Sequence, residues 1–124
     1  MSQRILVVDD SSLARRRARS ILESGGYDVI EAEDGMAALE RYFVDKPDVV
    51  MLDLVMTGMY GLDVLTKLRE MDPAVRVIVV SADVQTSSHE LVAAAGAAGF
   101  LVKPLDEQDA LSLVRTTLGD GHAD

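Results

Sequence analysis

Short apolar runs recur along the chain, and four of them are followed directly by a polar side chain. Longer segments that mix apolar and charged positions separate the runs. The four runs are Ile5 to Val8, Val49 to Leu52, Val77 to Val80 and Phe100 to Val102. Apolar runs of this length, bounded by polar or turn residues, predict strands that are buried on both faces. Another strand is expected from Tyr27 to Ala32.

The segments between the strands predict amphipathic helices, because their apolar residues recur at helical spacing. Ser11 or Ser12, Asp34 and Asp106 stand where side chains cap helix N-termini. Helices are expected to begin near Leu13, Asp34, Gly61, Thr86 and Asp106.

Two expectations concern which side chains are buried. The second helix is expected to turn one set of side chains inward: Met36, Ala37, Leu39 and Phe43. The longest uncharged stretch, Leu91 to Val102, is too short to span a bilayer. It is expected to form a buried helix, a turn and a strand.

Five alternating strand–helix units predict an α/β fold of three layers, (βα)5, with a doubly wound parallel five-stranded sheet and right-handed crossovers. The hydrophobic pattern does not give the order of the strands. Without a repeat or a linker, residues 1–119 are expected to form one domain, followed by a short tail at 120–124.

Five polar side chains stand at or just after the ends of four predicted strands: Asp9, Asp10, Asp53, Ser81 and Lys103. The carboxyl ends of parallel strands share one edge of the sheet, and open α/β sheets bind ligands there. We therefore expect three carboxylates, one hydroxyl and one ammonium group to meet in a single pocket. Helix capping does not account for Asp53, because Asp53 is followed by Leu54-Val55-Met56 and no helix is expected to start there.

The charges of this pocket predict a divalent cation. At a separation of about 5 Å and an effective dielectric near 20, each pair of carboxylates costs roughly 3 kcal/mol. Lys103 supplies only one positive charge. Mg²⁺ fits best because it binds few carboxylates and keeps several waters, and Mn²⁺ is the alternative ion. A metal ion beside Asp53 indicates phosphoryl chemistry, in which a carboxylate attacks phosphorus while Lys103 and Ser81 contact the phosphoryl oxygens.

Composition narrows the class of protein further. The net charge is −9, which argues against a nucleic-acid binder and fits a basic partner or a metal ion. Cysteine is absent, so disulfides, thiolate catalysis and Cys-ligated zinc are excluded. The N-terminus does not have the pattern of a secretory signal. We expect a soluble cytoplasmic domain with no insertion into the membrane.

The chain resembles the receiver domains of bacterial response regulators, the CheY-like proteins, from about Arg4 to Leu118. The matching motifs are Val7-Val8-Asp9-Asp10-Ser11, Met51-Leu52-Asp53-Leu54, Met56-Thr57-Gly58-Met59-Tyr60-Gly61, Val80-Ser81-Ala82 and Val102-Lys103-Pro104. The resemblance implies strand order 2-1-3-4-5, for which CheY is a standard example. It also implies a phosphoacceptor switch of a two-component system, which is not a turnover enzyme.

The resemblance assigns a role to each site residue. Asp53 would accept the phosphoryl group from a histidine kinase or a histidine phosphotransfer protein. Asp10 would bind Mg²⁺ directly, Asp9 directly or through water, and Asp53 and the main-chain carbonyl of Val55 would complete the protein ligands.

The resemblance also implies a switch. Ser81 and Phe100 match its two positions, and the Lys103–Pro104 peptide would be cis. Phosphorylation would draw Ser81 inward and bury Phe100. The face formed by the fourth helix, the fifth strand and the fifth helix would then favour a different target protein.

Two departures and one basic cluster stand out. Thr57 and Tyr60 replace the Pro and Asp that are usual in the family, and an altered partner choice or metal affinity is expected. Four arginines lie on the first helix: Arg15, Arg16, Arg17 and Arg19. They predict either a solvated face or, chiefly through Arg15, Arg16 and Arg19, a docking patch for an acidic kinase or phosphotransfer surface.

Other interpretations stay open at this point. An aspartyl-nucleophile phosphatase needs a second Asp where Val55 stands, and a flavodoxin would not place Asp9 and Asp10 against a phosphate. A receiver that binds partners without being phosphorylated is a further alternative. Because few residues follow the fifth helix, we expect a stand-alone regulator that acts by binding another protein, unless the chain is a fragment of a larger regulator. It could act in chemotaxis, as a phosphorelay intermediate or as a phosphate sink.

Overall fold

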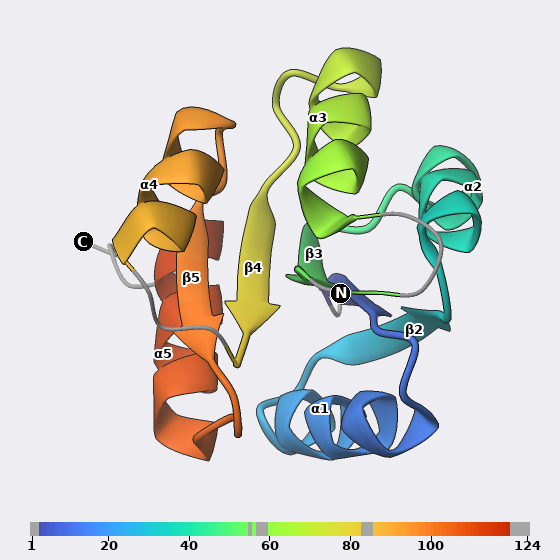
Figure 1. The fold of residues 1–124 in the computed structure, drawn as a ribbon. Coiled ribbons are helices and arrows are strands. Elements are labelled where there is room, and N and C mark those ends of the chain that lie inside the picture. Colours follow the sequence, from blue (N-terminus) through green and yellow to red (C-terminus); the bar gives the residue numbers. More distant parts are fainter. Residues whose placement is uncertain (1–2, 55, 57–59, 83–85, 120–124) are drawn as a thin grey trace.

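The computed structural model describes residues 3–54, 56, 60–82 and 86–119, with the main chain alone for 86–89. Within these residues, five strands and five helices alternate along the chain (Figure 1). The strands are β1 (Arg4–Val8), β2 (Asp28–Ala32), β3 (Val49–Asp53), β4 (Val77–Ser81) and β5 (Gly99–Val102). The helices are α1 (Ser12–Ser24), α2 (Gly35–Asp45), α3 (Gly61–Met71), α4 (Thr86–Ala94) and α5 (Glu107–Leu118).

The strands form one parallel sheet in the order β2-β1-β3-β4-β5. The predicted doubly wound α/β fold and the strand order implied by the resemblance are therefore confirmed. In the register, Asp53 of β3 lies beside Val80, and Ser81 of β4 lies beside Val102. The carboxyl ends of the central strands are thus level at one edge of the sheet.

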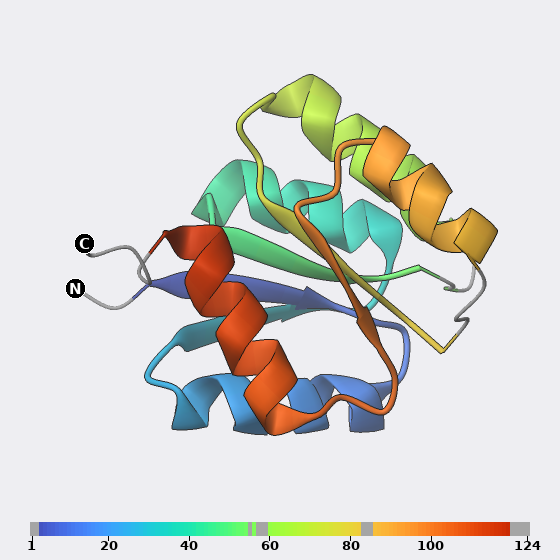
Figure 2. The ribbon, with the colours of Figure 1, turned by 90° about the vertical axis from the view of Figure 1, so that its left-hand side faces the viewer.

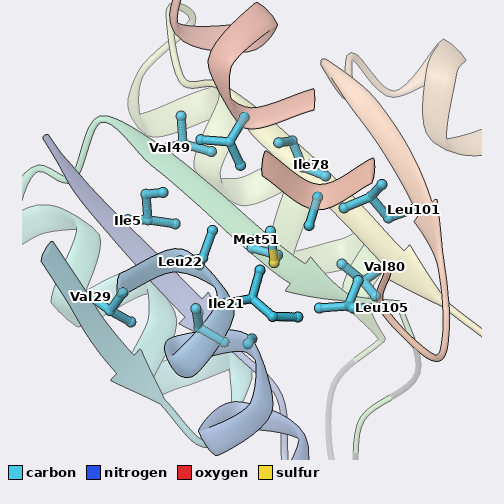
Figure 3. Packing of buried hydrophobic residues seen from close by; sticks show 14 of the residues in the cluster. Ile5, Ile21, Leu22, Val29, Val49, Met51, Ile78, Val80, Leu101 and Leu105 are labelled. Atoms are coloured by element: carbon cyan, nitrogen blue, oxygen red, sulfur yellow. The ribbon is translucent and has the colours of Figure 1, made fainter. Parts of the chain in front are cut away.

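Helices cover both faces of the sheet, with α1 and α5 on one face and α2, α3 and α4 on the other (Figure 2). Successive side chains of a strand point to opposite faces. Ile5, Val7 and Met51 accordingly pack under α1 and α5 (Figure 3), whereas Leu6 and Leu52 pack under the other helices. The central strands are buried on both sides, as their continuous apolar runs predicted.

Three helices begin at the predicted caps. The side chain of Ser11 accepts a hydrogen bond from the Ala14 amide, that of Asp34 from the Ala37 amide, and that of Asp106 from the Asp109 amide. Each bond pairs an amide that the helix itself leaves without a partner. Helix α3 differs, because the side chain of Tyr60 at its N-cap makes no capping hydrogen bond.

The predicted inner face of α2 is wrong in part: Ala37 and Leu39 pack partly buried against the apolar cluster on this side of the sheet, but Met36 and Phe43 do not. Met36 and Phe43 are 67% and 70% exposed, while Gly35, Ala38 and Tyr42 are buried. Both sets recur at intervals of three and four residues, so helical spacing alone does not choose between them. Gly35 and Ala38 are small enough for α2 to approach the sheet closely. The hydroxyl of the buried Tyr42 donates a hydrogen bond of 2.7 Å to Asp72.

The prediction of a buried segment from Leu91 to Val102 is also wrong in part. In the described part of α4, Val92 is 2% exposed but Leu91 is 58% exposed. Strand β5 is at the edge of the sheet, and Val102 is 41% exposed. Leu91 and Val102 are therefore apolar without being buried in this chain, and hydrophobicity alone does not predict their burial. Within the described residues, no helix combines the length and hydrophobicity that crossing a membrane requires.

Candidate functional site

The structure brings the predicted polar residues together at the carboxyl edge of the sheet. Asp9 follows β1, Asp53 ends β3, Ser81 ends β4, and Lys103 follows β5. Asp9, Asp10 and Asp53 each offer a carboxylate oxygen, and these three oxygens all lie within 4.8 Å of one another. Asp9, Asp53 and Ser81 are buried, whereas Asp10 is exposed at the mouth of the site.

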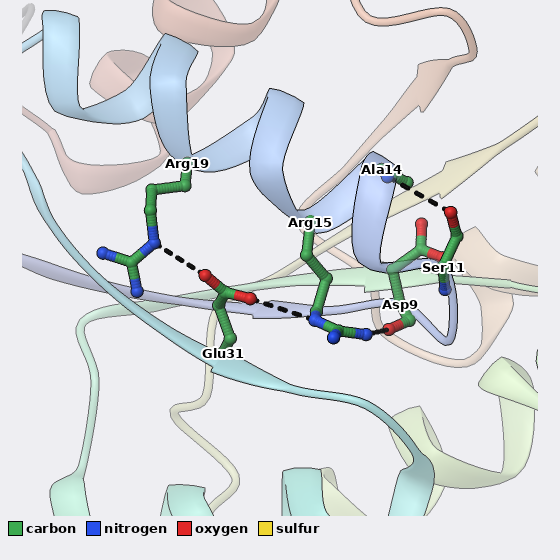
Figure 4. Close-up of polar contacts among 6 residues, drawn as sticks. All are labelled: Asp9, Ser11, Ala14, Arg15, Arg19 and Glu31. Atoms are coloured by element: carbon green, nitrogen blue, oxygen red, sulfur yellow. Dashed lines mark hydrogen bonds and ion pairs between the residues drawn. The ribbon is translucent and has the colours of Figure 1, made fainter.

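Asp9 is held by four contacts, the first of which is the hydrogen bond from its amide to the Ala32 carbonyl at 3.2 Å. Its Oδ1 accepts a hydrogen bond from the Ser11 amide at 2.9 Å, and its Oδ2 accepts one from Lys103 Nζ at 2.8 Å. Its main-chain carbonyl accepts a hydrogen bond from the guanidinium of Arg15 at 2.7 Å (Figure 4). The orientation of Asp9 is therefore set before any ligand binds.

Lys103 lies between two of the carboxylates, with Nζ 2.8 Å from Asp9 Oδ2 and 3.5 Å from Asp53 Oδ1. Partial burial lowers the pKa of Lys103, but the hydrogen bond that Lys103 donates to Asp9 and the charges of Asp53 and Asp9 outweigh this effect. The net pKa is raised, so the ammonium form is maintained at neutral pH. The Lys103–Pro104 peptide bond is cis, as the resemblance implied.

The donor set of the site fits Mg²⁺. Three carboxylates converge, Lys103 pairs with two of them, and hard oxygen ligands are those that Mg²⁺ prefers. Asp9, Asp10 and Asp53 are the described side chains that could hold the ion. The fourth predicted ligand, the carbonyl of Val55, lies outside the described residues, as does Thr57.

A cavity of about 620 Å³ adjoins these groups. Asp9, Asp53 and Lys103 line one part of it, and Leu13, Arg17 and Leu105 line the part between α1 and the loop after β5. The buried Asp53 carboxylate therefore borders a cavity of the size that small ligands occupy in proteins.

The two predicted switch residues lie on neighbouring strands. Ser81 is 2% exposed at the end of β4. Phe100 of β5 pairs in register with Val79 and packs partly buried against the apolar cluster under α2, α3 and α4. Phe100 is thus neither fully exposed nor fully buried in this structure, and its movement stays a prediction.

The arginines of α1 have partners that the sequence interpretation missed. Glu31, in the middle of β2, accepts hydrogen bonds from Arg15 Nε at 3.0 Å and from Arg19 Nε at 2.6 Å (Figure 4). The hydrogen bond from Arg19 is the main cause that lowers the pKa of Glu31, against the effect of burial, and Arg15 adds to it. The available signal was a carboxylate inside the predicted strand, between the apolar residues Ile30 and Ala32. A docking role for Arg15, Arg16 and Arg19 stays a prediction.

Fold and site together define a class: a doubly wound α/β domain whose sheet edge carries an acidic pocket suited to a divalent cation, with a lysine beside a buried aspartate. Comparison with known proteins identifies the family. The family model of the response regulator receiver domain matches residues 5–115, so the chain belongs to this family.

The sequence relatives include stand-alone and longer proteins. Chemotaxis protein CheY of Bacillus subtilis (strain 168) is 37% identical over 119 residues, which cover 95% of this chain and 99% of that protein. Response regulator MprA of Mycobacterium ulcerans (strain Agy99) is 37% identical over 118 residues, 95% of this chain but only 51% of MprA.

Solved structures agree with this assignment. Chemotaxis protein CheY4 of Vibrio cholerae has a TM-score of 0.90 at 26% identity, with 94% of this chain and 99% of that chain covered. A chain of the CheX–CheY–BeF3–Mg²⁺ complex from Borrelia burgdorferi has a TM-score of 0.87 at 33% identity, with 92% and 87% covered. The chain is therefore a CheY-like member of the two-component response regulators.

Proposed function

We propose that residues 1–119 form a phosphorylation-controlled switch in which Asp53 accepts a phosphoryl group from a histidine kinase or a histidine phosphotransfer protein. One observation carries the proposal. A buried Asp53 carboxylate lies 3.5 Å from the Lys103 ammonium, and its oxygen is grouped with those of Asp9 and Asp10 within 4.8 Å. The protein would catalyse only its own phosphorylation and dephosphorylation.

In the transfer step, a carboxylate oxygen of Asp53 attacks phosphorus in line with the leaving imidazole nitrogen. The phosphorus–nitrogen bond breaks as the phosphorus–oxygen bond forms, and the imidazole takes up a proton from solvent. Lys103 would attract the phosphoryl oxygens as a point charge, and Ser81 would donate a hydrogen bond to one of them. Mg²⁺ held by Asp9, Asp10, Asp53 and the Val55 carbonyl would neutralise phosphoryl charge.

The output of the switch would be a change of protein partner. Ser81, engaged by the phosphoryl group, would favour the inward position of Phe100 and alter the surface formed by α4, β5 and α5. Exposed Leu91 and Val102 on this surface support a protein target. The likeness to the Borrelia burgdorferi complex, which contains a CheY and a CheX, also supports a protein partner.

A chemotaxis pathway in the cytoplasm is the pathway we propose, because the CheY of Bacillus subtilis is covered almost completely by this chain. A phosphorelay intermediate and a phosphate sink use the same site and differ only in the partner. Neither nucleic acid nor a membrane is part of the proposal, in keeping with the net charge of −9.

The test is the mass of the intact protein after incubation with acetyl phosphate and Mg²⁺, with Asp53→Asn as the control. We expect one phosphoryl group on the parent protein and none on the variant. A parent protein that gains no phosphoryl group and binds no Mg²⁺ would instead indicate a constitutive binding module. Thr57 and Tyr60 would then be the first residues to restore to the family pattern.

A further inference from the structure

Helix α1 contacts two of the three segments that carry charged groups of the site, the loop after β1 and the loop after β5. The contacts come from two arginines on one helix, and each ends on a main-chain carbonyl of a different loop. We propose that Arg15 and Arg17 are positioning residues, Arg15 for the Asp9–Asp10 loop and Arg17 for the loop that carries Lys103. This inference rests on the proposed function and adds to it.

Arg15 connects the Asp9–Asp10 loop to the sheet. Its NH1 donates to the Asp9 carbonyl at 2.7 Å, while its Nε donates to Glu31 at 3.0 Å. Glu31 is held in turn by Arg19 Nε at 2.6 Å. The side chain of Arg15 is 15% exposed, whereas those of Glu31 and Arg19 are 31% and 36% exposed. The end of this chain of charge-assisted hydrogen bonds next to Asp9 is therefore the part best shielded from water. Figure 4 shows these hydrogen bonds in order, between Arg19 and Glu31, between Glu31 and Arg15, and between Arg15 and Asp9.

Arg17 connects α1 to the other side of the pocket. Its NH2 donates to the carbonyl of Leu105 at 2.7 Å. Leu105 is two residues after Lys103, and both residues line the same cavity as Arg17. The loop after β5 passes beside α1, as Figure 2 also shows. The Lys103 amide still donates a hydrogen bond to the Ser81 carbonyl at 2.9 Å. The contact from Arg17 restrains the loop two residues further on, at Leu105.

The two contacts should affect different steps. Groups that orient metal ligands without touching the metal typically change metal affinity or activity about 10- to 100-fold when removed. Arg15 restrains the residues that would bind Mg²⁺. Arg17 restrains the residue that would meet the phosphoryl group. Loss of Arg15 should therefore weaken Mg²⁺ binding, and loss of Arg17 should slow transfer at saturating Mg²⁺.

The sign of the effect separates positioning from simple electrostatics. Arg15 is a cation close to three carboxylates, so charge alone predicts that Arg15→Ala binds Mg²⁺ more tightly. Positioning predicts weaker binding. A docking role for the arginines predicts no effect with a small phosphodonor, because acetyl phosphate needs no protein surface.

The experiment compares the parent protein with Arg15→Ala, Arg15→Lys and Arg17→Ala. Arg41→Ala is the matched control, since it removes the same charge from an exposed ion pair on α2. Mg²⁺ affinity is measured by calorimetry, the rate of phosphorylation by acetyl phosphate at saturating Mg²⁺, and the folded state by urea unfolding. Rates are compared only among variants that remain folded in the assay buffer.

We expect Arg15→Ala to weaken Mg²⁺ binding about tenfold, with Arg15→Lys between it and the parent, and Arg17→Ala to keep the affinity and lose about tenfold in rate. Equal or tighter Mg²⁺ binding by both Arg15 variants would overturn the role of Arg15. A parent-like rate in Arg17→Ala would overturn the role of Arg17. If the parent were not phosphorylated at all, the proposed function would fail, while the Mg²⁺ affinities would still decide the role of Arg15.

Discussion

Lys103 Nζ donates a 2.8 Å hydrogen bond to Asp9 Oδ2, although β3 and β4 lie between the strands that these two residues follow. The lysine side chain thus extends across the carboxyl edge of the sheet and passes within 3.5 Å of Asp53. This one cation offsets part of the repulsion among three carboxylates when no metal ion is bound.

The contribution of Lys103 to stability should disappear in alkaline solution. Because its pKa is raised on folding, its contribution is complete below the ordinary value of 10.5 and is lost as pH rises through the higher folded value. We expect Lys103→Met to lose about 2 kcal/mol near neutral pH, since a partly buried charged hydrogen bond is removed. Urea unfolding in EDTA across this pH range measures the difference, which should shrink above the ordinary pKa. A constant difference would contradict the assignment.

Removal of Asp10 should stabilise the metal-free protein. Asp10→Asn takes one negative charge from the cluster, which should raise the free energy of unfolding in EDTA by about 1 kcal/mol. The same variant should lose the stabilisation by Mg²⁺, which for the parent is about 2.7 kcal/mol at a hundred times the dissociation constant. Urea unfolding with EDTA and with Mg²⁺ tests both effects. Equal stabilisation of parent and variant by Mg²⁺ would exclude Asp10 as a ligand.

A side chain at Gly61 should disturb Asp53. A Cβ there would lie 2.5 Å from the Asp53 carbonyl oxygen and 2.6 Å from Leu54 Cα, which are main-chain atoms and cannot rotate away. Gly61→Ala should therefore cost about 3 kcal/mol of stability and slow phosphorylation. Gly99→Ala is the control, because its Cβ would meet only the end of the Leu113 side chain. Similar losses in both variants would contradict this explanation.

Neighbouring aromatic residues of α2 should differ sharply in their contribution to stability. Tyr42 is 8% exposed and Phe43 is 70% exposed. Tyr42→Ala should lower the free energy of unfolding by about 3 kcal/mol, whereas Phe43→Ala should change it by less than about 0.5 kcal/mol. Chemical unfolding of the two variants shows which of the two side chains of α2 contributes to the core. The opposite ranking would restore the inner face that the sequence predicted.

A capping side chain at residue 60 should stabilise α3. Tyr60 occupies the N-cap without a capping hydrogen bond, and its backbone is already extended, as a cap requires. Tyr60→Asp should raise the free energy of unfolding by about 1 kcal/mol relative to Tyr60→Ala. Thermal and urea unfolding provide the comparison. A lower stability for the Asp variant would mean that repulsion from the acidic pocket exceeds the gain from capping.

Local sequence determined the elements and the location of the site. Continuous apolar runs predict buried parallel strands, and Ser11, Asp34 and Asp106 mark helix starts, because both signals depend on residues close in the chain. Asp53 followed by Leu54 was informative for the same reason, since no helix begins there. The resemblance, and not the pattern, supplied the strand order.

Tertiary structure decided which of several compatible contacts form. Helical spacing allowed either Met36 and Phe43 or Ala38 and Tyr42 to face inward. Packing of α2 against the sheet placed Ala38 and Tyr42 inward and left Met36 and Phe43 exposed. Likewise, four arginines at adjacent positions were equivalent in sequence. The positions of Glu31 and of the Asp9 and Leu105 carbonyls around α1 separate their roles. Glu31 and Leu105 come from other strands and loops, and only the tertiary structure brings them to α1.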